Sequence, residues 1–178
     1  MQKRFALPCL ALIGLLAAIP VFAQTSAALP KADGMVSAGE YRFTKTASDI
    51  TLGVTLSADG KTLYVSVQAP TTGWVAFGVG SLKMNGAFMV LAYDANGAPT
   101  ISEQTGKGHS HSPNAASILT AGAVKETNGV TTLEAALPAS SFVTGDTIKF
   151  IAASGRADNL TSMHRGFFPA EVPVSQAK

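Results

Sequence analysis

The sequence has little charge and almost no cysteine. Charged residues make up 13% of its 178 residues, about half the share in an average globular protein. This low share argues against a disordered, highly charged chain and against a helical bundle or coiled coil, whose wet faces need many Glu, Lys and Arg residues. Glycine, with 17 residues, and proline, with nine, are present alongside many Thr, Ser and Val residues, which is typical of an all-β chain with many turns.

Residues 1–23 have the features of a secretory signal peptide. Two basic residues lie near the start, and the run from 5 to 18 is almost wholly apolar. The small residues Val21 and Ala23 then precede a predicted cleavage site. A retained membrane anchor is the alternative, but the apolar run is shorter than the ~20 residues that a membrane-spanning helix needs. We therefore predict a secreted or periplasmic protein with no membrane span once the signal is removed.

Removal of the signal changes both the charge and the thiol content of the chain. Lys3 and Arg4 leave with it, so the number of basic residues falls from 13 to 11 and equals the 11 acidic residues. A neutral domain has no electrostatic basis for binding nucleic acid. The single cysteine, Cys9, is also removed. Its loss excludes a disulfide, a thiolate metal site, a thiol nucleophile and thioether attachment of a haem.

Apolar and polar residues alternate along much of the remaining chain, which predicts β-strands. The clearest strand is 61–69, and a hairpin turn at Asp59-Gly60 joins it to the run 50–57. Two denser apolar runs, 74–79 and 87–93, indicate central strands with both faces covered. Further strands are expected at 99–103, 123–126, 130–137, 148–154 and 166–172, and a short amphipathic helix within 114–120 is a weaker expectation.

These elements predict an all-β fold, a single antiparallel β-sandwich. We place it at residues 33–173, between a flexible lead-in at 24–32 and a tail at 174–178. No second domain, repeat or low-complexity segment is evident.

Hydrolase and nucleotide-binding motifs are missing from the sequence. There is no Gly-x-Ser-x-Gly elbow, no His-Glu-x-x-His pair and no phosphate-binding loop, and no nucleophile–base pair can be assembled from the motifs. The chain after the signal does hold three histidines and four methionines. Imidazole and thioether ligands suit haem iron or copper. We therefore expect a binding or electron-transfer protein that is not an enzyme by itself.

Two of these residues stand out as candidate ligands. Met84 lies in a polar loop between two apolar strands, where alternation does not explain a methionine, although it could fill a gap in the core. His164 lies between the basic Arg165 and the aromatic Phe167 and Phe168. A histidine that ligates haem iron needs apolar side chains around the macrocycle and a cation that can pair with a propionate. The alternative is that His164 is an ordinary surface histidine.

His109 and His111 form a separate pair. In an extended segment their side chains share one face and could bind copper or zinc together. The flanking Gly106, Gly108 and Pro113 indicate a mobile loop, in which surface histidines without a ligand are the simpler interpretation.

Several motifs together resemble the DOMON domain family. They are Thr72-Gly73-Trp74-Val75-Ala76-Phe77-Gly78-Val79-Gly80, Met84-Asn85-Gly86-Ala87, Asp33-Gly34-Met35-Val36 with Gly39-Glu40-Tyr41, and Ile151-Ala152-Ala153-Ser154-Gly155 followed by a histidine and Arg165-Gly166. The resemblance covers about residues 33–173. It implies an immunoglobulin-like sandwich that binds b-type haem or, in some members, a sugar. The cytochrome domain of cellobiose dehydrogenase is similar to this family.

The resemblance also implies which residues bind the cofactor. In haem-binding members a methionine and a histidine hold the iron, and by position these are Met84 and His164. Trp74, Phe77, Phe88 and Phe167 are expected as pocket walls, and Arg165 as a partner of the haem. Many members have Asp where this chain has Phe88, and their Arg-Gly pair lies farther from the histidine, so His109 and His111 are fallback ligands.

Three functions follow from these expectations. The first is a secreted or periplasmic b-type cytochrome with non-covalent haem and Met/His axial ligation. It would pass electrons to a redox partner such as a membrane cytochrome or a periplasmic oxidoreductase. The second is a haem-free module for a carbohydrate or other small ligand, with Trp74, Tyr41, Tyr64 and Tyr93 as stacking faces. The third is a periplasmic copper-binding protein that uses His109, His111 and methionines.

Overall fold

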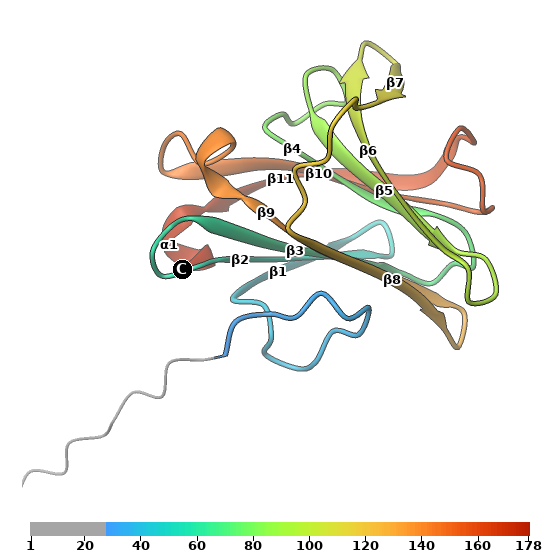
Figure 1. Ribbon diagram of the computed structural model, residues 1–178, viewed down its shortest axis with the longest axis horizontal. Helices are drawn as coiled ribbons and strands as arrows, with labels where there is room; N and C mark the ends of the chain where they lie inside the picture. The colour runs from blue at the N-terminus through green and yellow to red at the C-terminus, as the bar shows by residue number, and fades with distance from the viewer. Residues whose placement is uncertain (1–27) are drawn as a thin grey trace, which may run out of the picture.

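The computed structural model describes residues 28–178, so the predicted signal peptide and residues 24–27 lie outside the described part. The described chain forms two antiparallel sheets that face each other (Figure 1). This arrangement confirms the predicted all-β sandwich. None of the helices in residues 28–178 is long and apolar enough to cross a membrane.

One sheet has five strands in the order β1-β2-β3-β9-β8. Its strands are β1 (Phe43–Ala47), β2 (Ile50–Leu56), β3 (Thr62–Ala69), β9 (Val130–Pro138) and β8 (Ala121–Thr127). The predicted hairpin turn at Asp59-Gly60 and a second hairpin turn at Asn128-Gly129 both connect neighbouring strands of this sheet. Asn128 and Gly129 have φ values of +53° and +73°, the left-handed conformation that two-residue hairpins require.

The other sheet has six strands in the order β11-β10-β4-β5-β6-β7. Its strands are β11 (His164–Pro173), β10 (Thr147–Gly155), β4 (Val75–Val79), β5 (Phe88–Asp94), β6 (Pro99–Lys107) and β7 (Ser110–Pro113). Short helical turns follow β9 and β11, namely η1 (Ala139–Ser141) and α1 (Val174–Ala177).

Several local expectations differ from the structure. Strands β1 and β7 were not predicted, and β6 continues four residues beyond the expected end at residue 103. The segment 106–113, expected as a mobile loop, instead forms the end of β6, a tight turn and β7, with Gly106 paired to His111. Residues 114–120 are not helical. The predicted tail at 174–178 contains α1, in which Ala177 is fully buried.

The hydrophobic core lies between the two sheets. Alternate residues of each strand point into it, so Val75, Phe77 and Val79 of β4 meet residues of the five-stranded sheet such as Val65 and Val67. All five side chains are completely buried. Burying one such side chain contributes roughly 1.5–3 kcal/mol to the free energy of folding. The sum over the many buried side chains of this core explains why a chain of this length folds without a disulfide.

The six-stranded sheet is apolar on its other face as well. A second buried cluster lies on the face of β4 and β5 that points away from the core. It contains Trp74, Ala76, Met89 and Leu91. The two dense apolar runs of the sequence are therefore covered on both faces, as predicted. On the outer face, the covering residues belong to loops that surround a cavity.

Glu134 fastens the N-terminal segment to the five-stranded sheet. Its side chain is completely buried on β9 and accepts hydrogen bonds from the backbone N–H groups of Asp33, Gly34 and Met35. The Tyr41 hydroxyl donates a further bond of 2.8 Å to Oε1. Burial raises the pKa of Glu134 more than these hydrogen bonds lower it. Burial and the nearby carboxylate also raise the pKa of Tyr41, which keeps its hydroxyl a neutral donor.

Candidate functional site

A cavity of about 920 Å³ lies on the outer face of the six-stranded sheet. Its floor consists of side chains from three adjacent strands, namely Trp74 and Ala76 from the β4 segment, Met89 and Leu91 from β5, and Ile151 and Ala153 from β10. These residues alternate with the core residues of the same strands. The floor is thus a direct product of the period-2 pattern on strands that are apolar on both faces.

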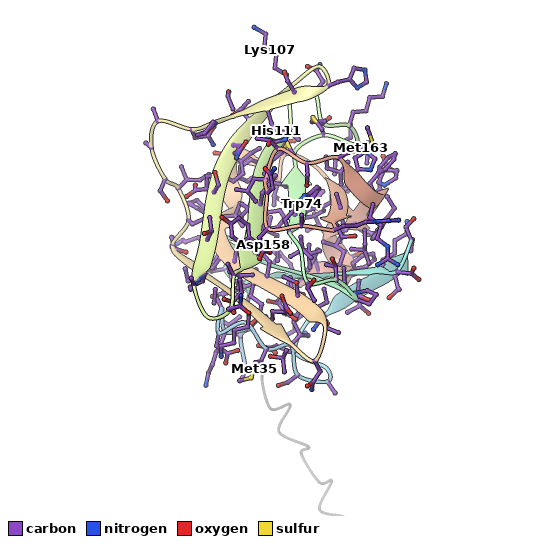
Figure 2. The ribbon with its side chains drawn as sticks, turned by 90° about the vertical axis from the view of Figure 1, so that its right-hand side faces the viewer. Met35, Trp74, Lys107, His111, Asp158 and Met163 are labelled. Carbon is purple, nitrogen blue, oxygen red and sulfur yellow. The ribbon has the colours of Figure 1, made fainter. Side chains whose placement is uncertain are left out.

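Three connections form the walls of this cavity. The β4–β5 loop supplies Leu82, Lys83, Met84 and Asn85, the β6–β7 hairpin supplies Gly108, His109 and His111, and the segment around the start of β11 supplies Thr161, Ser162, Met163, His164 and Phe167. Figure 2 shows His111 and Met163 above Trp74 at one end of the molecule, with Met35 at the opposite end. Segments far apart in the sequence thus meet around one space.

Met84 and His164 both line this cavity although 79 residues separate them in the sequence. His164 is exposed at the first position of β11, and its ring meets the ring of Phe167 edge-on with 4.9 Å between the centroids. Met163, next to it, has 86% of its surface exposed. The structure therefore brings the two predicted ligands to one site and places an open, partly apolar rim beside the histidine.

The loop that carries Met84 is held against strand β6. Its backbone carbonyl accepts a 3.0 Å bond from Ala87 N–H, and Gly86 N–H donates a 3.0 Å bond to the carbonyl of Gly106. A Cβ atom at Gly106 would overlap the carbonyl oxygen of Met84. The Asn85 side chain also accepts a 2.8 Å bond from Gly108 N–H. A glycine at position 106 is therefore required for the observed position of Met84.

Trp74 connects the floor of the cavity to the segment that carries His164. Its Nε1 donates a 2.9 Å hydrogen bond to Ser162 Oγ, and that hydroxyl donates to the carbonyl of Asn159 over 2.8 Å. The indole also packs so closely over Gly155 that a Cβ atom there would overlap the ring. Trp74 is 5% exposed, so it serves as a rigid base for the cavity.

His111 is the second imidazole with a defined environment, after His164. Its Nδ1 is hydrogen-bonded to Oε1 of Gln104, which lies across the hairpin on β6 and is only 6% exposed. Gln104 in turn donates from Nε2 to Ser102 Oγ over 3.0 Å. His109 lies at the exposed tip of the same hairpin and also lines the cavity.

Three of the predicted pocket residues lie elsewhere. Phe77 is fully buried in the core between the sheets. Phe88 packs against Phe142, with ring centroids 5.4 Å apart. Arg165 donates a 2.9 Å bond to the carbonyl of Pro70 and lies 3.9 Å from Asp49, beside a separate polar hollow. Trp74 and Phe167 do line the cavity.

None of the three tyrosines that were considered as stacking faces lines the cavity in the described chain, although Tyr93 packs against the buried cluster that forms its floor. The Tyr41 hydroxyl is engaged with Glu134, and neither Tyr64 nor Tyr93 is among the residues that line the cavity within the described chain.

Sequence reasoning missed several residues of the site. Met89, Leu91, Ile151 and Ala153 could have been found, because they have the same strand parity as Trp74 and Ala76 on adjacent strands. Lys83 and Gln104 carried no such signal, because their roles depend on how a loop and a hairpin fold over the sheet.

The lining of the cavity is mostly apolar and carries little charge. Lys83 is the one permanently charged residue among the described residues that line it, and no acidic side chain does so. Within residues 28–178, no group of three or more His, Cys, Asp or Glu side chains is arranged to hold a metal. The site therefore fits a largely apolar ligand, with imidazole and thioether groups available to a soft or borderline metal.

Comparisons with known proteins agree with this description. Residues 46–155 match the sequence model of the DOMON domain. The cytochrome b domain of pyranose dehydrogenase from Coprinopsis cinerea has a similar structure, with a TM-score of 0.60 and 17% identity over 74% of this chain and 80% of that chain. The cytochrome domain of Myriococcum thermophilum cellobiose dehydrogenase has a TM-score of 0.56 and 11% identity over 76% of this chain and 89% of that chain. A search of curated proteins found no match.

Proposed function

Because the chain belongs to the DOMON domain family, we propose that it binds b-type haem without a covalent bond and transfers single electrons. The observation that carries the proposal is the presence of Met84 and His164 on the wall of one apolar cavity. The fold that this chain shares with the cytochrome domains of two dehydrogenases supports it.

The cavity fits such a group in size and in chemistry. Its volume of about 920 Å³ lies near the upper end of the range of about 300–1,000 Å³ that small-molecule and cofactor pockets occupy. The apolar floor, made of residues such as Trp74, Leu91 and Ile151, suits a flat macrocycle. A thioether and an imidazole are an established axial pair for haem iron. Met84 and His164 are therefore the proposed axial ligands.

The charged end of the cofactor would meet Lys83. Arg165, the cation expected from the sequence, is directed to the carbonyl of Pro70 and does not line the cavity. Lys83 does, on the same loop as Met84. An ammonium group there would partly neutralise a propionate, in place of the predicted role of Arg165.

The residues of the site favour electron transfer over bond chemistry. When bound, haem supplies a one-electron iron couple. Met84 and His164 together would occupy both axial positions, so the protein leaves none open for a substrate. The Met84 thioether stabilises the ferrous state and raises the reduction potential. The apolar floor excludes water and reduces the reorganisation of solvent when the charge changes. We propose an electron carrier that is not an enzyme by itself.

The proposed location is the periplasm or the outside of the cell, following cleavage after Ala23. The proposed partner is another redox protein, either a membrane cytochrome or a periplasmic oxidoreductase. Met163 and Phe167, which are 86% and 56% exposed, give the rim beside His164 an apolar contact surface for it. Such a partner would come within a short distance of the cavity at this rim.

Optical spectroscopy of the purified protein tests the cofactor proposal. Haem-loaded protein should show a Soret band and, after reduction with dithionite, the sharp visible bands of a six-coordinate low-spin haem. Met84→Ala and His164→Ala should each change these bands or lose the haem. Met35→Ala is a matched control, because Met35 is exposed at the far end of the molecule. Absence of a Soret band, or bands unaltered in both ligand variants, would contradict the proposal.

Copper binding is a second candidate for this cavity. His109, His111 and His164 line it together with Met84 and Met163, and these are ligands that copper accepts. Titration of haem-free protein with copper, compared with a His109→Ala/His111→Ala double variant, distinguishes the two. A stoichiometry unchanged in the double variant would exclude the site predicted from the sequence. The carbohydrate alternative has less support, since only Trp74 of its four expected stacking residues is among the described residues that line the cavity.

A further inference from the structure

The cavity is also lined by an imidazole that is fixed by a hydrogen bond and is not one of the two proposed ligands, Met84 and His164. His111 lines the cavity, and its Nδ1 is hydrogen-bonded to the buried side chain of Gln104. Gln104 is only 6% exposed, so its contact with His111 is sheltered from solvent and fixes the position of the ring. Gln104 is itself oriented by its 3.0 Å bond to Ser102 Oγ.

These bonds define which ring nitrogen of His111 is available. Because Nε2 of Gln104 donates to Ser102, its Oε1 faces His111, and a carbonyl oxygen can only accept. Nδ1 of His111 therefore carries a proton, and in the neutral ring Nε2 has the free lone pair. A histidine whose Nδ1–H is held by an oxygen acceptor is the form that ligates a metal through Nε2, and the acceptor increases its basicity.

His111 also belongs to the same wall of the cavity as Met84. It pairs with Gly106 across the β6–β7 hairpin, and Met84 packs directly on Gly106. The loop and the hairpin are joined by the bonds from Gly86 to Gly106 and from Gly108 to Asn85. The thioether and the imidazole are thus presented from one connected unit, while His164 comes from a different segment.

We propose that His111 is an alternative axial ligand, which replaces the Met84 thioether on the haem iron. The inference rests on the proposed haem-binding function. In the exchange the iron–sulfur bond breaks and an iron–nitrogen bond forms with the lone pair of Nε2. With the imidazole in its neutral form, the exchange releases no proton and transfers no electron. The ligand set would change from Met/His to His/His, which lowers the reduction potential.

Removal of the thioether tests this proposal. Haem-loaded Met84→Ala, and Met84→Leu to retain volume, should remain six-coordinate and low-spin by absorption and electron paramagnetic resonance, with a lower potential than the wild type. Adding His111→Ala to either variant should give high-spin haem or release it. Adding Lys107→Ala, on the same hairpin but directed away from the molecule, is the matched control and should leave the low-spin signal intact. High-spin or haem-free Met84 variants would overturn the proposal.

Gln104 provides a test of the positioning argument. In the Met84→Leu background, Gln104→Glu keeps an acceptor for Nδ1–H and should preserve the low-spin fraction. Gln104→Leu removes the acceptor and should reduce that fraction at least severalfold. Equal low-spin fractions in the two variants would overturn the role of Gln104. A wild type without a Soret band would overturn the proposed function as well, whereas a Met/His wild type with high-spin Met84 variants would overturn this inference alone.

Discussion

The indole of Trp74 donates a 2.9 Å hydrogen bond to Ser162, a residue 88 positions later in the chain. This bond joins the floor of the cavity to the segment that precedes His164 by two residues. Because Ser162 also donates to the carbonyl of Asn159, the segment is fixed at two points. The position of the proposed histidine ligand therefore depends on a tryptophan at the start of a different strand.

Trp74→Phe should weaken haem binding while leaving the fold intact. The variant keeps an aromatic ring on the cavity floor but loses the bond to Ser162. A neutral hydrogen bond contributes about 0.5–1.5 kcal/mol, so the haem dissociation constant should rise about 2- to 10-fold in a Soret titration. Ser162→Ala, which removes the acceptor, should produce an effect of similar size. Unchanged affinity in both variants would mean that the bond does not position the site.

Gly106→Ala should displace Met84. The added Cβ would overlap the Met84 carbonyl oxygen, so the β4–β5 loop must move outward. We expect the loss of the Met/His spectrum, with conversion to another ligand set or to high-spin haem. Gly145→Ala is the control, because a Cβ there meets no atom within 4 Å and its backbone is not left-handed. If Gly106→Ala retained the wild-type spectrum and potential, Met84 would not depend on this close contact.

Lys83→Gln should reduce haem affinity through the lost charge. An exposed or partly exposed ion pair contributes up to about 1 kcal/mol, which corresponds to at most about a fivefold change. The difference between the variant and the wild type should shrink as ionic strength rises, because salt screens the interaction. Lys107→Gln is the control, since Lys107 points away from the molecule at the end of β6 (Figure 2). An equal effect in both variants would exclude a specific role for Lys83.

Glu134 should affect how stability depends on pH. Because burial raises its pKa, folding favours the protonated acid. The resulting stabilisation is present below the unfolded-state pKa of about 4.3 and is lost as the pH rises through the higher folded-state pKa. Glu134→Gln does not titrate, and its amide can still accept from the backbone and donate to Tyr41. Chemical denaturation should show the wild type losing stability relative to this variant as the pH rises from about 4.

Glu134→Ala should destabilise the fold at every pH, because it removes the acceptor of the Gly34 N–H group and of the Tyr41 hydroxyl, and one of two acceptors of the Asp33 and Met35 N–H groups. Unsatisfied groups of this kind cost about 1–3 kcal/mol each when fully buried. A pH dependence that runs in the opposite direction would show that the hydrogen bonds outweigh burial at Glu134.

Phe77 should affect stability and leave the cofactor unaffected. Its ring is completely buried between the sheets, so Phe77→Ala should reduce the free energy of unfolding by about 3–5 kcal/mol. The milder Phe77→Leu should fold and keep the haem bands of the wild type. A shifted Soret band in Phe77→Leu would contradict the assignment of this side chain to the core.

The period-2 pattern was sufficient to predict the sandwich and most of its strands. Strand β3 alternates clearly, and the Asn128-Gly129 turn has one favoured hairpin conformation. The missed strands β1 and β7 are short and mostly exposed, so they carry no apolar alternation. Gly106 in β6 and Gly108 in the following turn concealed the β6–β7 hairpin, because glycine is common both in mobile loops and in tight turns.

The site was less predictable than the fold. Met84 and His164 were proposed as ligands from their chemistry and from the family resemblance, and both line the cavity, while their role as ligands stays a prediction. Phe77 was expected in the cavity wall but lies in the core. In a strand that is apolar on both faces, the sequence does not indicate which face an aromatic side chain occupies. Arg165 was adjacent to the histidine in sequence, but it is the unpaired residue of a register shift between His164 and Gly166, where strand alternation does not apply. Lys83 entered the site through a loop, whose path no periodicity describes.

Along strand β4 and the residue before it, successive side chains alternate between packing in the core and lining the cavity. Val75, Phe77 and Val79 hold the two sheets together, while the alternating Trp74 and Ala76 face the cavity. Selection can therefore alter what the molecule accommodates by changing one set of side chains, without disturbing the other set that keeps it folded. A protein engineer could treat the outward-facing positions as an independent library for new chromophores.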